Sequence, residues 1–352
     1  MKTVTVSASR TYEVQIEKGL LSRAGACMRG LLPPPRTVTV VSDDTVFALW
    51  GEKLTASLKE AGYTVKEFVI PHGEQSKTPD TLFSLWNALA AEGLTRTDCL
   101  AALGGGVVGD IVGFAAATYL RGIPFVQFPT TLLAMVDSSV GGKTAVDLPA
   151  GKNLVGAFNQ PVGVFCDTDT LSTLPAEIYA DGCAEVIKYG YINDPTLLEM
   201  LKNDFSAEPD EVIARCVEDK RDVVESDERD TGVRQLLNLG HTAGHAVEHC
   251  SNFEISHGSA VAIGMVLMTR AAVNSGICDP DVLPHLINML RAYSLPTDCP
   301  FGAAALAAVA MGDKKRAGKK ITLVLPKTLG ESILYPIEAK DLEAFFAKGL
   351  EA

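Results

Sequence analysis

The sequence predicts an α/β protein of 352 residues, with a parallel-sheet domain over residues 1–175 and a mostly α-helical domain over residues 176–352. Two observations predict this division. In the first half, short apolar runs alternate with helical patterns, which is typical of a parallel sheet with helices on both faces. After Pro175 the strand signals fade and long helical patterns separated by glycine or proline follow. A ligand site between two such domains is expected.

The individual elements follow from apolar periodicity. Residues 2–6 alternate in polarity and indicate a strand. The other elements expected in the first domain are strands at 37–41, 64–70 and 99–103 and helices near 44–59, 82–91 and 111–119. In the second domain we expect helices at 177–192, 209–227, 258–274 and 303–311 and one late strand at 321–325.

Composition limits the class of protein. The formal net charge of −12 argues against nucleic-acid binding, which needs a basic surface, but leaves room for a small anionic substrate held by local cations. No apolar run is long enough for a membrane helix, and the start lacks the pattern of a signal peptide, so we expect a cytoplasmic protein. The eight cysteines are dispersed and are expected to be reduced and mostly buried.

A glycine turn follows the third expected strand. Gly104, Gly106 and Gly109 have the GxGxxG spacing, and a helix of small residues comes next. Backbone N–H groups in such a turn can approach the pyrophosphate of a dinucleotide at a helix N-terminus. The structural alternative is a tight strand-to-helix turn. Asp43 or Glu74 could hold a ribose hydroxyl, although Asp43 serves equally well as a helix N-cap.

The stretch between Cys99 and Cys166 carries six charged residues in 68 positions. Isolated charges among small and apolar residues are expected to be partly buried, and buried charges need a partner or a ligand. Lys143 and Lys152 follow glycines, and we interpret them as holding a phosphate or a carboxylate. The segment 138–144 resembles a phosphate-binding loop in its chemistry but lacks the Walker A spacing. The alternative is a pair of structural ion pairs with Asp137 and Asp147.

Four of the six histidines fall between His241 and His257. His241, His245 and His249 share one helical face, and His257 opens the next apolar helix. One histidine on an apolar face is usually a core residue, whereas several at this spacing favour metal binding or acid–base work. The cluster therefore predicts a metal centre.

A carboxylate commonly completes a two-histidine zinc site. Glu185 is the best candidate, with Lys188 three residues later on the same helical face. The alternative, a surface ion pair, fits their apolar neighbours poorly. Lys220 falls on the apolar stripe of the expected helix 209–227, where a snorkelling side chain is the alternative. Arg234 lies four residues before Asn238, and both are polar residues that precede His241.

Taken together, these motifs resemble the 3-dehydroquinate synthase family of sugar-phosphate cyclases. The matching segments, in chain order, are 71–77, 104–110, 129–133, 137–146, 151–153, 184–190, 237–248, 257–258 and 313–315. The resemblance implies a Rossmann-like domain followed by a helical metal-binding domain. It also implies conversion of 3-deoxy-D-arabino-heptulosonate 7-phosphate to 3-dehydroquinate and phosphate, with NAD regenerated in each turnover and a homodimer in which Arg121 reaches the partner's site.

The resemblance also assigns roles to residues. Glu185, His241 and His257 would bind a divalent metal, Zn²⁺ or alternatively Co²⁺, and His245 would do acid–base or positioning work. The positions that match substrate contacts are Arg121, Asp137, Lys143, Lys152, Asn153, Lys188, Lys220, Arg234 and Asn238, with one of Lys314 and Lys315. The positions that match the NAD site are Asp43, His72, Gly73, Glu74, Gln75, Ser76, Lys77, Gly106, Val107, Val108, Gly109, Asp110, Thr130, Thr131, Lys143, Lys152, Thr170, Leu171, Ser172 and Thr173.

Two positions depart from the family pattern. His72 stands where aspartate is frequent, and Asp230 stands where glutamate is expected. Three other functions are alternatives to the synthase. A 2-deoxy-scyllo-inosose or valiolone synthase acts on a substrate without a carboxylate, whereas the presence of Lys220, Arg234, Asn238 and His245 favours a substrate that carries one. A metal-dependent alcohol or glycerol dehydrogenase would have little use for so many anion-binding residues, and a non-catalytic NAD-binding protein would leave the metal cluster unexplained.

Overall fold

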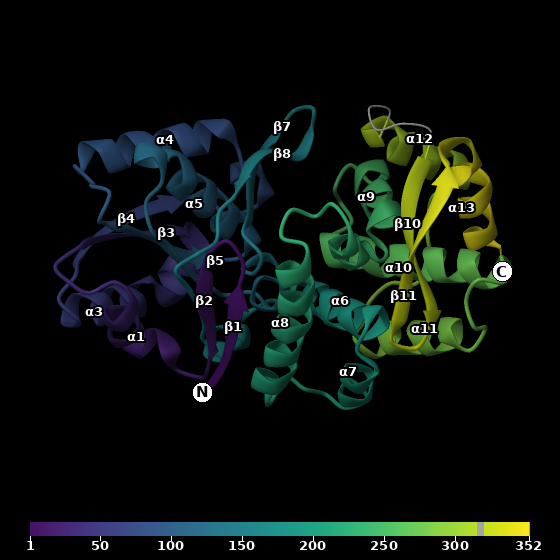
Figure 1. Ribbon diagram of the computed structural model, residues 1–352, viewed down its shortest axis with the longest axis horizontal. Helices are drawn as coiled ribbons and strands as arrows, with labels where there is room; N and C mark the ends of the chain where they lie inside the picture. Colours follow the sequence, from purple (N-terminus) through teal and green to yellow (C-terminus); the bar gives the residue numbers. More distant parts are fainter. Residues whose placement is uncertain (315–319, 352) are drawn as a thin grey trace. The chain divides into compact units, whose positions relative to one another are not determined.

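The computed structural model describes residues 1–314 and 320–351. The chain forms two compact units, Met1–Pro175 with Pro209–Arg229 and Ala176–Glu208 with Asp230–Ala352 (Figure 1). The expected boundary after residue 175 coincides with one division of the chain. The segment 209–229 differs from the expected domain assignment, because it groups with the first unit. Its helix, α8 (Pro209–Ser226), packs against the first strand, where Glu225 accepts a hydrogen bond of 2.6 Å from the backbone of Ser7.

The first unit contains a seven-stranded sheet, which confirms the predicted class. The strand order is β1-β2-β9-β6-β5-β3-β4; β1 is antiparallel to β2 and the remaining pairs are parallel. The strands are β1 (Lys2–Ser7), β2 (Thr11–Ile16), β3 (Thr37–Asp43), β4 (Thr64–Ile70), β5 (Cys99–Gly104), β6 (Phe125–Pro129) and β9 (Gly163–Cys166).

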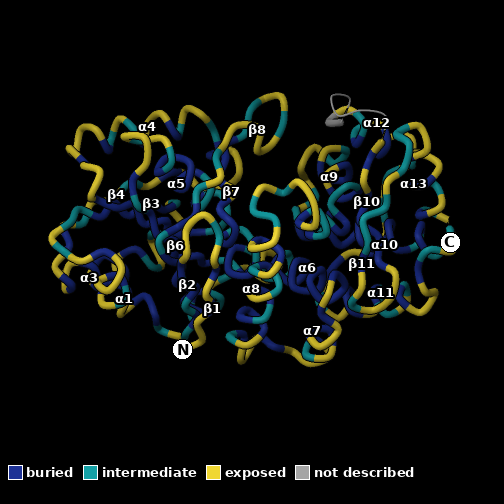
Figure 2. The backbone as a smooth tube through the Cα atoms, in the orientation of Figure 1, coloured by how far each residue is buried: buried dark blue, intermediate teal, exposed yellow. Residues whose placement is uncertain are grey.

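Helices cover both faces of this sheet, because its central strands are apolar on both sides. In β5, Cys99, Ala101 and Leu103 face one core with α1 and α3, whereas Leu100 and Ala102 face a second core with α4 and α5. The central strands are buried and the outer sides of α3 and α4 are exposed (Figure 2). The helices are α1 (Ala24–Leu31), α2 (Asp44–Val46), α3 (Glu52–Glu60), α4 (Pro79–Ala91) and α5 (Gly106–Thr118).

The strand order creates a topological switch point. From β3 the chain adds β4 on one side and then β5 on the other, so the carboxyl ends of β3 and β5 are neighbours. Ser42 and Leu103 face each other there, and the Ser42 hydroxyl donates a hydrogen bond of 2.7 Å to the Leu103 carbonyl. Ligands of open α/β sheets bind outside the carboxyl ends of the strands at such a point.

The segment 138–144, interpreted as a phosphate-like loop, leads into a hairpin. It consists of β7 (Lys143–Leu148) and β8 (Gly151–Phe158), with Lys143 on the first strand and Lys152 on the second. The first unit is completed by short 3-10 or π-helical segments at Leu20–Arg23, Phe47–Gly51, Glu74–Ser76, Tyr119–Arg121, Ala134–Ser138 and Thr168–Thr173.

The second unit is built around α10 (His257–Asn274), which is buried along most of its length and packs against α6, α9 and α13. The one late strand predicted at 321–325 is instead a two-stranded hairpin, because β11 follows β10 after a tight turn. The other elements are α6 (Ala176–Ile192), α7 (Pro195–Met200), α9 (His241–Cys250), α11 (Val282–Ala292), α12 (Ala303–Lys314), α13 (Leu342–Leu350), β10 (Lys320–Thr328), β11 (Glu331–Glu338) and 3-10 segments Val233–Asn238 and Ala339–Asp341.

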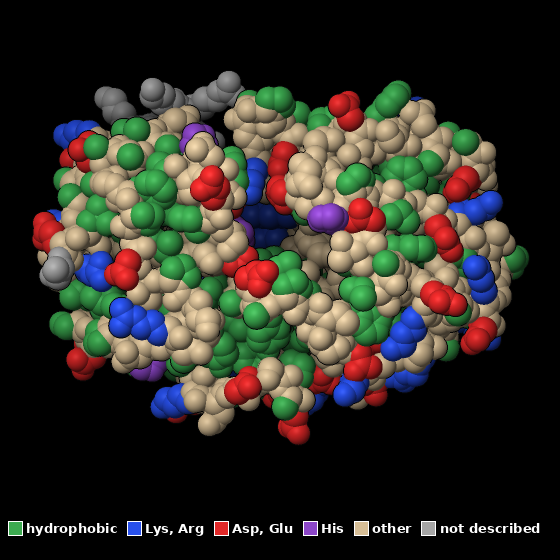
Figure 3. Space-filling view, turned by 180° about the vertical axis from the view of Figure 1, so that it is seen from behind, with side chains coloured by type: hydrophobic (Ala, Val, Ile, Leu, Met, Phe, Trp, Pro, Cys, Tyr) green, Lys and Arg blue, Asp and Glu red, His purple; other side chains and the backbone are tan. Residues whose placement is uncertain are grey.

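Three global properties agree with the composition. Within residues 1–314 and 320–351, no helix is both long and apolar enough to span a bilayer. Acidic and basic side chains are interspersed over the viewed face of each unit (Figure 3). All eight cysteines are free, and five of them are buried.

Candidate functional site

Three side chains of the second unit converge on one point. The Oε1 atom of Glu185 in α6 lies 3.6 Å from Nε2 of His241, which opens α9, and 3.5 Å from Nε2 of His257, which opens α10. Ligand atoms bound at about 2.0–2.2 Å to a tetrahedral ion lie roughly 3.3–3.6 Å apart. The spacing of the three donors therefore fits a divalent metal ion.

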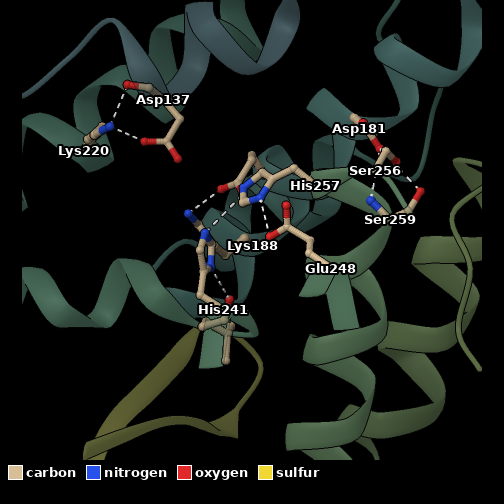
Figure 4. Close-up of polar contacts among 11 residues, drawn as sticks. Asp137, Asp181, Lys188, Lys220, His241, Glu248, Ser256, His257 and Ser259 are labelled. Carbon is tan, nitrogen blue, oxygen red and sulfur yellow. Dashed lines mark hydrogen bonds and ion pairs between the residues drawn. The ribbon is translucent and has the colours of Figure 1, made fainter. Parts of the chain in front are cut away.

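Both imidazoles present the ring nitrogen that a metal needs. Nδ1 of His241 lies 3.1 Å from the Leu239 carbonyl, and Nδ1 of His257 lies 3.3 Å from Oε2 of Glu248. With Nδ1–H donating to these acceptors, Nε2 of each ring is the atom that faces Glu185 and the one that a metal ion would bind in place of any proton there. Figure 4 shows the His257 ring held beside Glu248.

The two histidines differ in protonation. Burial lowers the pKa of His241 to about 3, although the Glu185 charge opposes that shift, so this ring is neutral at pH 7. Burial also acts to lower the pKa of His257, but hydrogen bonds and charge from Glu185 and Glu248 outweigh it and raise that pKa to about 10. A proton on His257 then partly compensates two carboxylates in the protein without metal, and a metal ion would replace it.

Glu185 and Lys188 are not the surface pair considered as an alternative. Both side chains are 1% exposed, and the Lys188 ammonium contacts Oε2 of Glu185. The two oxygens of Glu185 are therefore used differently: Oε1 faces the histidines and Oε2 faces Lys188. A buried carboxylate needs such compensation, because an unpaired charge in the interior is costly.

Glu248 was missed by the sequence analysis. It is buried on α9, seven residues after His241 and three after His245, so the helical period places it on the histidine face. That spacing was the available signal. Glu248 also joins His245 and His257 in a second group of potential metal-binding atoms that shares His257 with the first.

The other two histidines of α9, His245 and His249, differ in their position relative to the proposed metal ligands. The ring centroid of His245 lies 5.3 Å from that of His241 and 6.0 Å from that of His257, and its side chain is exposed beside the ligand group. His249 is exposed one turn further on and packs against Phe253. His249 belongs to neither group of potential metal-binding residues among those that the structure describes.

The predicted NAD residues gather at the carboxyl edge of the parallel sheet. Asp43 ends β3, the loop 72–77 follows β4, Gly104–Asp110 follows β5, Thr130 and Thr131 follow β6, and 170–173 follows β9. Gly105 is the N-cap of α5, whose first turn therefore presents backbone N–H groups at the switch point. A Cβ on Gly109 would lie 2.7 Å from the Gln127 amide oxygen, so glycine permits close packing there.

Lys77 connects several of these segments. Its ammonium lies 2.6 Å from Oδ2 of Asp110 in α5 and 2.6 Å from Oδ1 of Asn153 in β8, and its side chain is 6% exposed. Burial acts to lower the pKa of Lys77, but Asp110 and Glu74 outweigh that effect and raise it. Lys152 reaches the same cluster, with its ammonium 3.9 Å from Oε1 of Glu74.

Polar contacts connect the loop 72–77, which follows β4, to Asp44, which follows β3. The backbone N–H and Nδ1 of His72 lie 3.1 and 2.8 Å from Oδ1 of Asp44. The Ser76 hydroxyl donates to the Pro71 carbonyl, and the Gln75 amide donates to the His72 carbonyl. Asp43 caps α2 through the Val46 N–H at 2.9 Å, which is the structural role anticipated for it.

The predicted substrate residues divide between the units. Lys220 is buried, as its stripe position suggested, and its ammonium contacts both the Asp137 carboxylate and the Asp137 carbonyl, the latter at 2.6 Å. The alternative that Lys220 snorkels to solvent is therefore wrong. Asn153 has a positive φ of 56° in β8, and its backbone N–H donates to Asp147.

In the second unit, Arg234 is 2% exposed and Asn238 is half-buried, both on the 3-10 segment that precedes His241. Asp230 adopts a positive φ of 58°, a conformation that aspartate tolerates better than most residues. Lys315 lies outside the described residues, and so does the side chain of Lys314, whose backbone ends α12.

Two family models cover most of the chain. Residues 67–181 match the N-terminal model of 3-dehydroquinate synthase and residues 182–316 match its C-terminal model. The 3-dehydroquinate synthase of Caulobacter vibrioides (strain NA1000 / CB15N) is 45% identical, with 97% of this chain and 96% of that protein covered. The 3-dehydroquinate synthase of Streptococcus suis (strain 05ZYH33) is 43% identical, with 97% of this chain and 99% of that protein covered.

This chain belongs to the 3-dehydroquinate synthase family. Members of the family are lyases that convert 3-deoxy-D-arabino-heptulosonate 7-phosphate to 3-dehydroquinate and phosphate in aromatic amino acid biosynthesis, and this reaction is the function of the chain. The first two rivals considered from the sequence recur as structural neighbours, at much lower identity.

Among solved structures, 2-epi-5-epi-valiolone synthase from Streptomyces hygroscopicus subsp. jinggangensis 5008, with NAD⁺ and Zn²⁺ bound, is 28% identical with a TM-score of 0.86 over 98% of each chain. A 2-deoxy-scyllo-inosose synthase complexed with carbaglucose-6-phosphate, NAD⁺ and Co²⁺ has a TM-score of 0.87 over 99% of this chain and 100% of its own. Because it is only 24% identical, this likeness shows the fold alone. The same holds for the glycerol dehydrogenase of Schizosaccharomyces pombe, which is 14% identical with a TM-score of 0.67 and covers 99% of this chain and 90% of its own.

Proposed function

We propose that this synthase works with a recycled NAD and one divalent ion, Zn²⁺ or alternatively Co²⁺, held by Glu185, His241 and His257. The observation that carries the metal assignment is the 3.5 and 3.6 Å spacing of the three donor atoms. The metal-bearing cyclases named above support the choice of ions.

Bound NAD would supply reversible hydride transfer, and a divalent ion held by Glu185, His241 and His257 would polarise substrate hydroxyl and carbonyl oxygens. The side chains of the protein bind and orient an anionic substrate. Lys143, Lys152, Lys188, Lys220 and Arg234 supply cationic groups for its phosphate and carboxylate. Few acid–base groups are needed if the departing phosphate removes the proton next to the transient ketone. His245, exposed beside the metal ligands, is proposed to move or position a proton.

The switch point is the proposed NAD site. The first turn of α5 would bind the pyrophosphate through backbone N–H groups, because the helix dipole favours an anion there. Lys77 would hold the loop 72–77 and the hairpin strand β8 in place through Asp110 and Asn153. Thr130, Thr131 and the segment 170–173 would complete the site at the ends of β6 and β9.

A homodimer in the cytoplasm is part of the proposal. Arg121 lies before β6, at the amino ends of the parallel strands, whereas the proposed NAD residues lie at their carboxyl ends. It is exposed in a left-handed turn with a φ of 66°. Arg121 is therefore placed away from the NAD residues of its own unit, which supports a role at a partner's site.

The test is a turnover assay with NAD⁺ far below the substrate concentration. Metal-loaded protein is incubated with the heptulosonate 7-phosphate, and phosphate release and NADH absorbance are followed together. Many phosphates released per NAD⁺ without accumulating NADH would support the proposal. NADH formed in proportion to product would favour a dehydrogenase. Comparable turnover of a sugar phosphate that lacks the carboxylate would favour the other cyclases.

A further inference from the structure

The start of α10 is capped by a residue of another helix. The N-cap of α10 is Ser256, but its side chain makes no capping hydrogen bond within its own helix. Its hydroxyl instead donates to Oδ1 of Asp181 in α6, at 2.6 Å. The same oxygen accepts the Ser259 backbone N–H at 3.0 Å and the Ser259 hydroxyl at 3.4 Å. Figure 4 shows Asp181 beside Ser256 and Ser259.

Asp181 thus occupies the place that an N-cap side chain normally takes, because it accepts the N–H of the third helical residue. A carboxylate at this end of a helix is also favoured by the helix dipole. His257, the first residue of α10, lies between Ser256 and Ser259 in the chain and is a proposed metal ligand. Asp181 therefore fixes the backbone position from which the His257 ring extends.

The helix that carries Asp181, α6, also carries the proposed metal ligand Glu185. Asp181 precedes Glu185 by four residues in α6, so the two carboxylates lie on one face of that helix, a turn apart. Asp181 holds the helix of His257 and Glu185 supplies the oxygen that faces His257. One turn of α6 therefore sets the separation between two ligands.

The backbone contact at this point is close. A Cβ added to Gly258 would lie 2.3 Å from the Cα and 2.4 Å from the carbonyl oxygen of Asp181. Because those atoms belong to the backbone of α6, they cannot rotate away as a flexible side chain could. Glycine at 258 lets the first turn of α10 approach α6 closely enough for the Asp181 contacts to form.

We propose that Asp181 is a positioning residue for the metal centre: it caps α10 from α6 and thereby fixes the distance between His257 and Glu185. This inference rests on the proposed metal site. It predicts that Asp181→Ala weakens the affinity for Zn²⁺ by about 10- to 100-fold, as is typical when a group supporting a ligand is removed. Asp181→Asn keeps an acceptor oxygen for all three donors and should retain most of the affinity.

The matched control is Asp194→Ala. Asp194 caps α7 in the same unit, accepting the N–H groups of Thr196 and Leu197 at 3.0 and 3.1 Å, and α7 carries none of the proposed ligands. Loss of this cap should lower thermal stability to a similar degree but change Zn²⁺ affinity by less than about threefold. Ser256→Ala, which removes one of the three donors, should fall between Asp181→Asn and Asp181→Ala.

The experiment measures Zn²⁺ affinity by chelator competition, the visible spectrum of the Co²⁺-loaded protein, and amide exchange at Ser259 in the metal-free protein. Asp181→Ala should weaken binding, alter the Co²⁺ bands and speed exchange at Ser259. Faster exchange with unchanged affinity and spectrum would overturn the proposal, because the cap would then be structural only. If Asp181→Ala does not fold, Ser256→Ala decides by the same criteria. Failure of the parent protein to bind Zn²⁺ would instead reject the metal site itself.

Discussion

Oε1 of Glu185 lies 3.5 Å from Nε2 of His257, and the opposite side of the same imidazole lies 3.3 Å from Oε2 of Glu248. His257 is therefore held between two buried carboxylates, one proposed to bind the metal and the other accepting from Nδ1. A carboxylate behind a metal-binding histidine fixes the tautomer and raises the basicity of the ligand.

The first prediction concerns Glu248. Glu248→Ala should weaken Zn²⁺ binding by about 10- to 100-fold, because Nδ1 of His257 loses its acceptor and the ring loses its fixed orientation. Glu248→Gln should recover part of the affinity, since its amide oxygen can accept the same hydrogen bond. Chelator competition measures the effect. Equal affinities in the alanine variant and the parent would show that Glu248 does not support the ligand.

The second prediction concerns pH. The pKa of His257 in the metal-free protein is about 10, above its ordinary value, whereas that of His241 is about 3. At pH 7 His257 carries the proton that an ion must displace and His241 carries none, so binding should release about one proton. Zn²⁺ affinity should rise up to tenfold per pH unit between pH 7 and 9. Titration calorimetry in buffers of different ionisation enthalpy counts the protons, and zero release would contradict this assignment.

The same shift has a consequence for stability. Because the folded-state pKa of His257 is raised, protonated His257 stabilises the metal-free protein fully below its unfolded pKa of about 6.5, and this contribution is lost as the pH rises towards 10. The metal-free protein should therefore become less stable between pH 7 and 10, and the metal-loaded protein should lose less. Urea unfolding of both forms measures the difference.

The third prediction concerns the buried Lys188–Glu185 pair. Lys188→Met leaves a buried carboxylate with less compensation and should lower the free energy of unfolding of the metal-free protein by about 3–5 kcal/mol. Lys202→Met removes the exposed pair with Glu199, which has the same three-residue spacing, and should cost less than about 1 kcal/mol. Similar losses in the two variants would mean that the Lys188 pair contributes no more than a surface pair.

The sequence predicted the features that depend on local spacing. The helices on both faces of the sheet were predictable from apolar runs such as 99–104, which are buried on both sides. The histidine cluster followed from helical period. The position of α8 could not be predicted, because an amphipathic helix does not reveal which unit its apolar stripe contacts. Strand β11 was missed because its burial alternates poorly and Pro336 interrupts its apolar pattern.

The site residues show the same distinction. Glu185 was selected because a carboxylate in an apolar helix is unusual, and the structure brings it to His241 and His257. Glu248 could have been selected from its spacing on the histidine face of α9, whereas the role of Asp181 comes from contacts across helices. Asp181 contacts residues 75 and 78 positions away, and no local pattern records such a pairing.

The measurement that tests the account most directly is the metal content of His257→Ala beside that of His249→Ala. Both residues belong to the histidine cluster, but His249 is exposed and outside the ligand group. After loading with Zn²⁺ and removal of excess ion, the parent and His249→Ala should each retain about one ion per chain, and His257→Ala should retain almost none while keeping the circular dichroism spectrum of the parent. Retention of one tightly bound ion by folded His257→Ala would contradict the proposed metal centre.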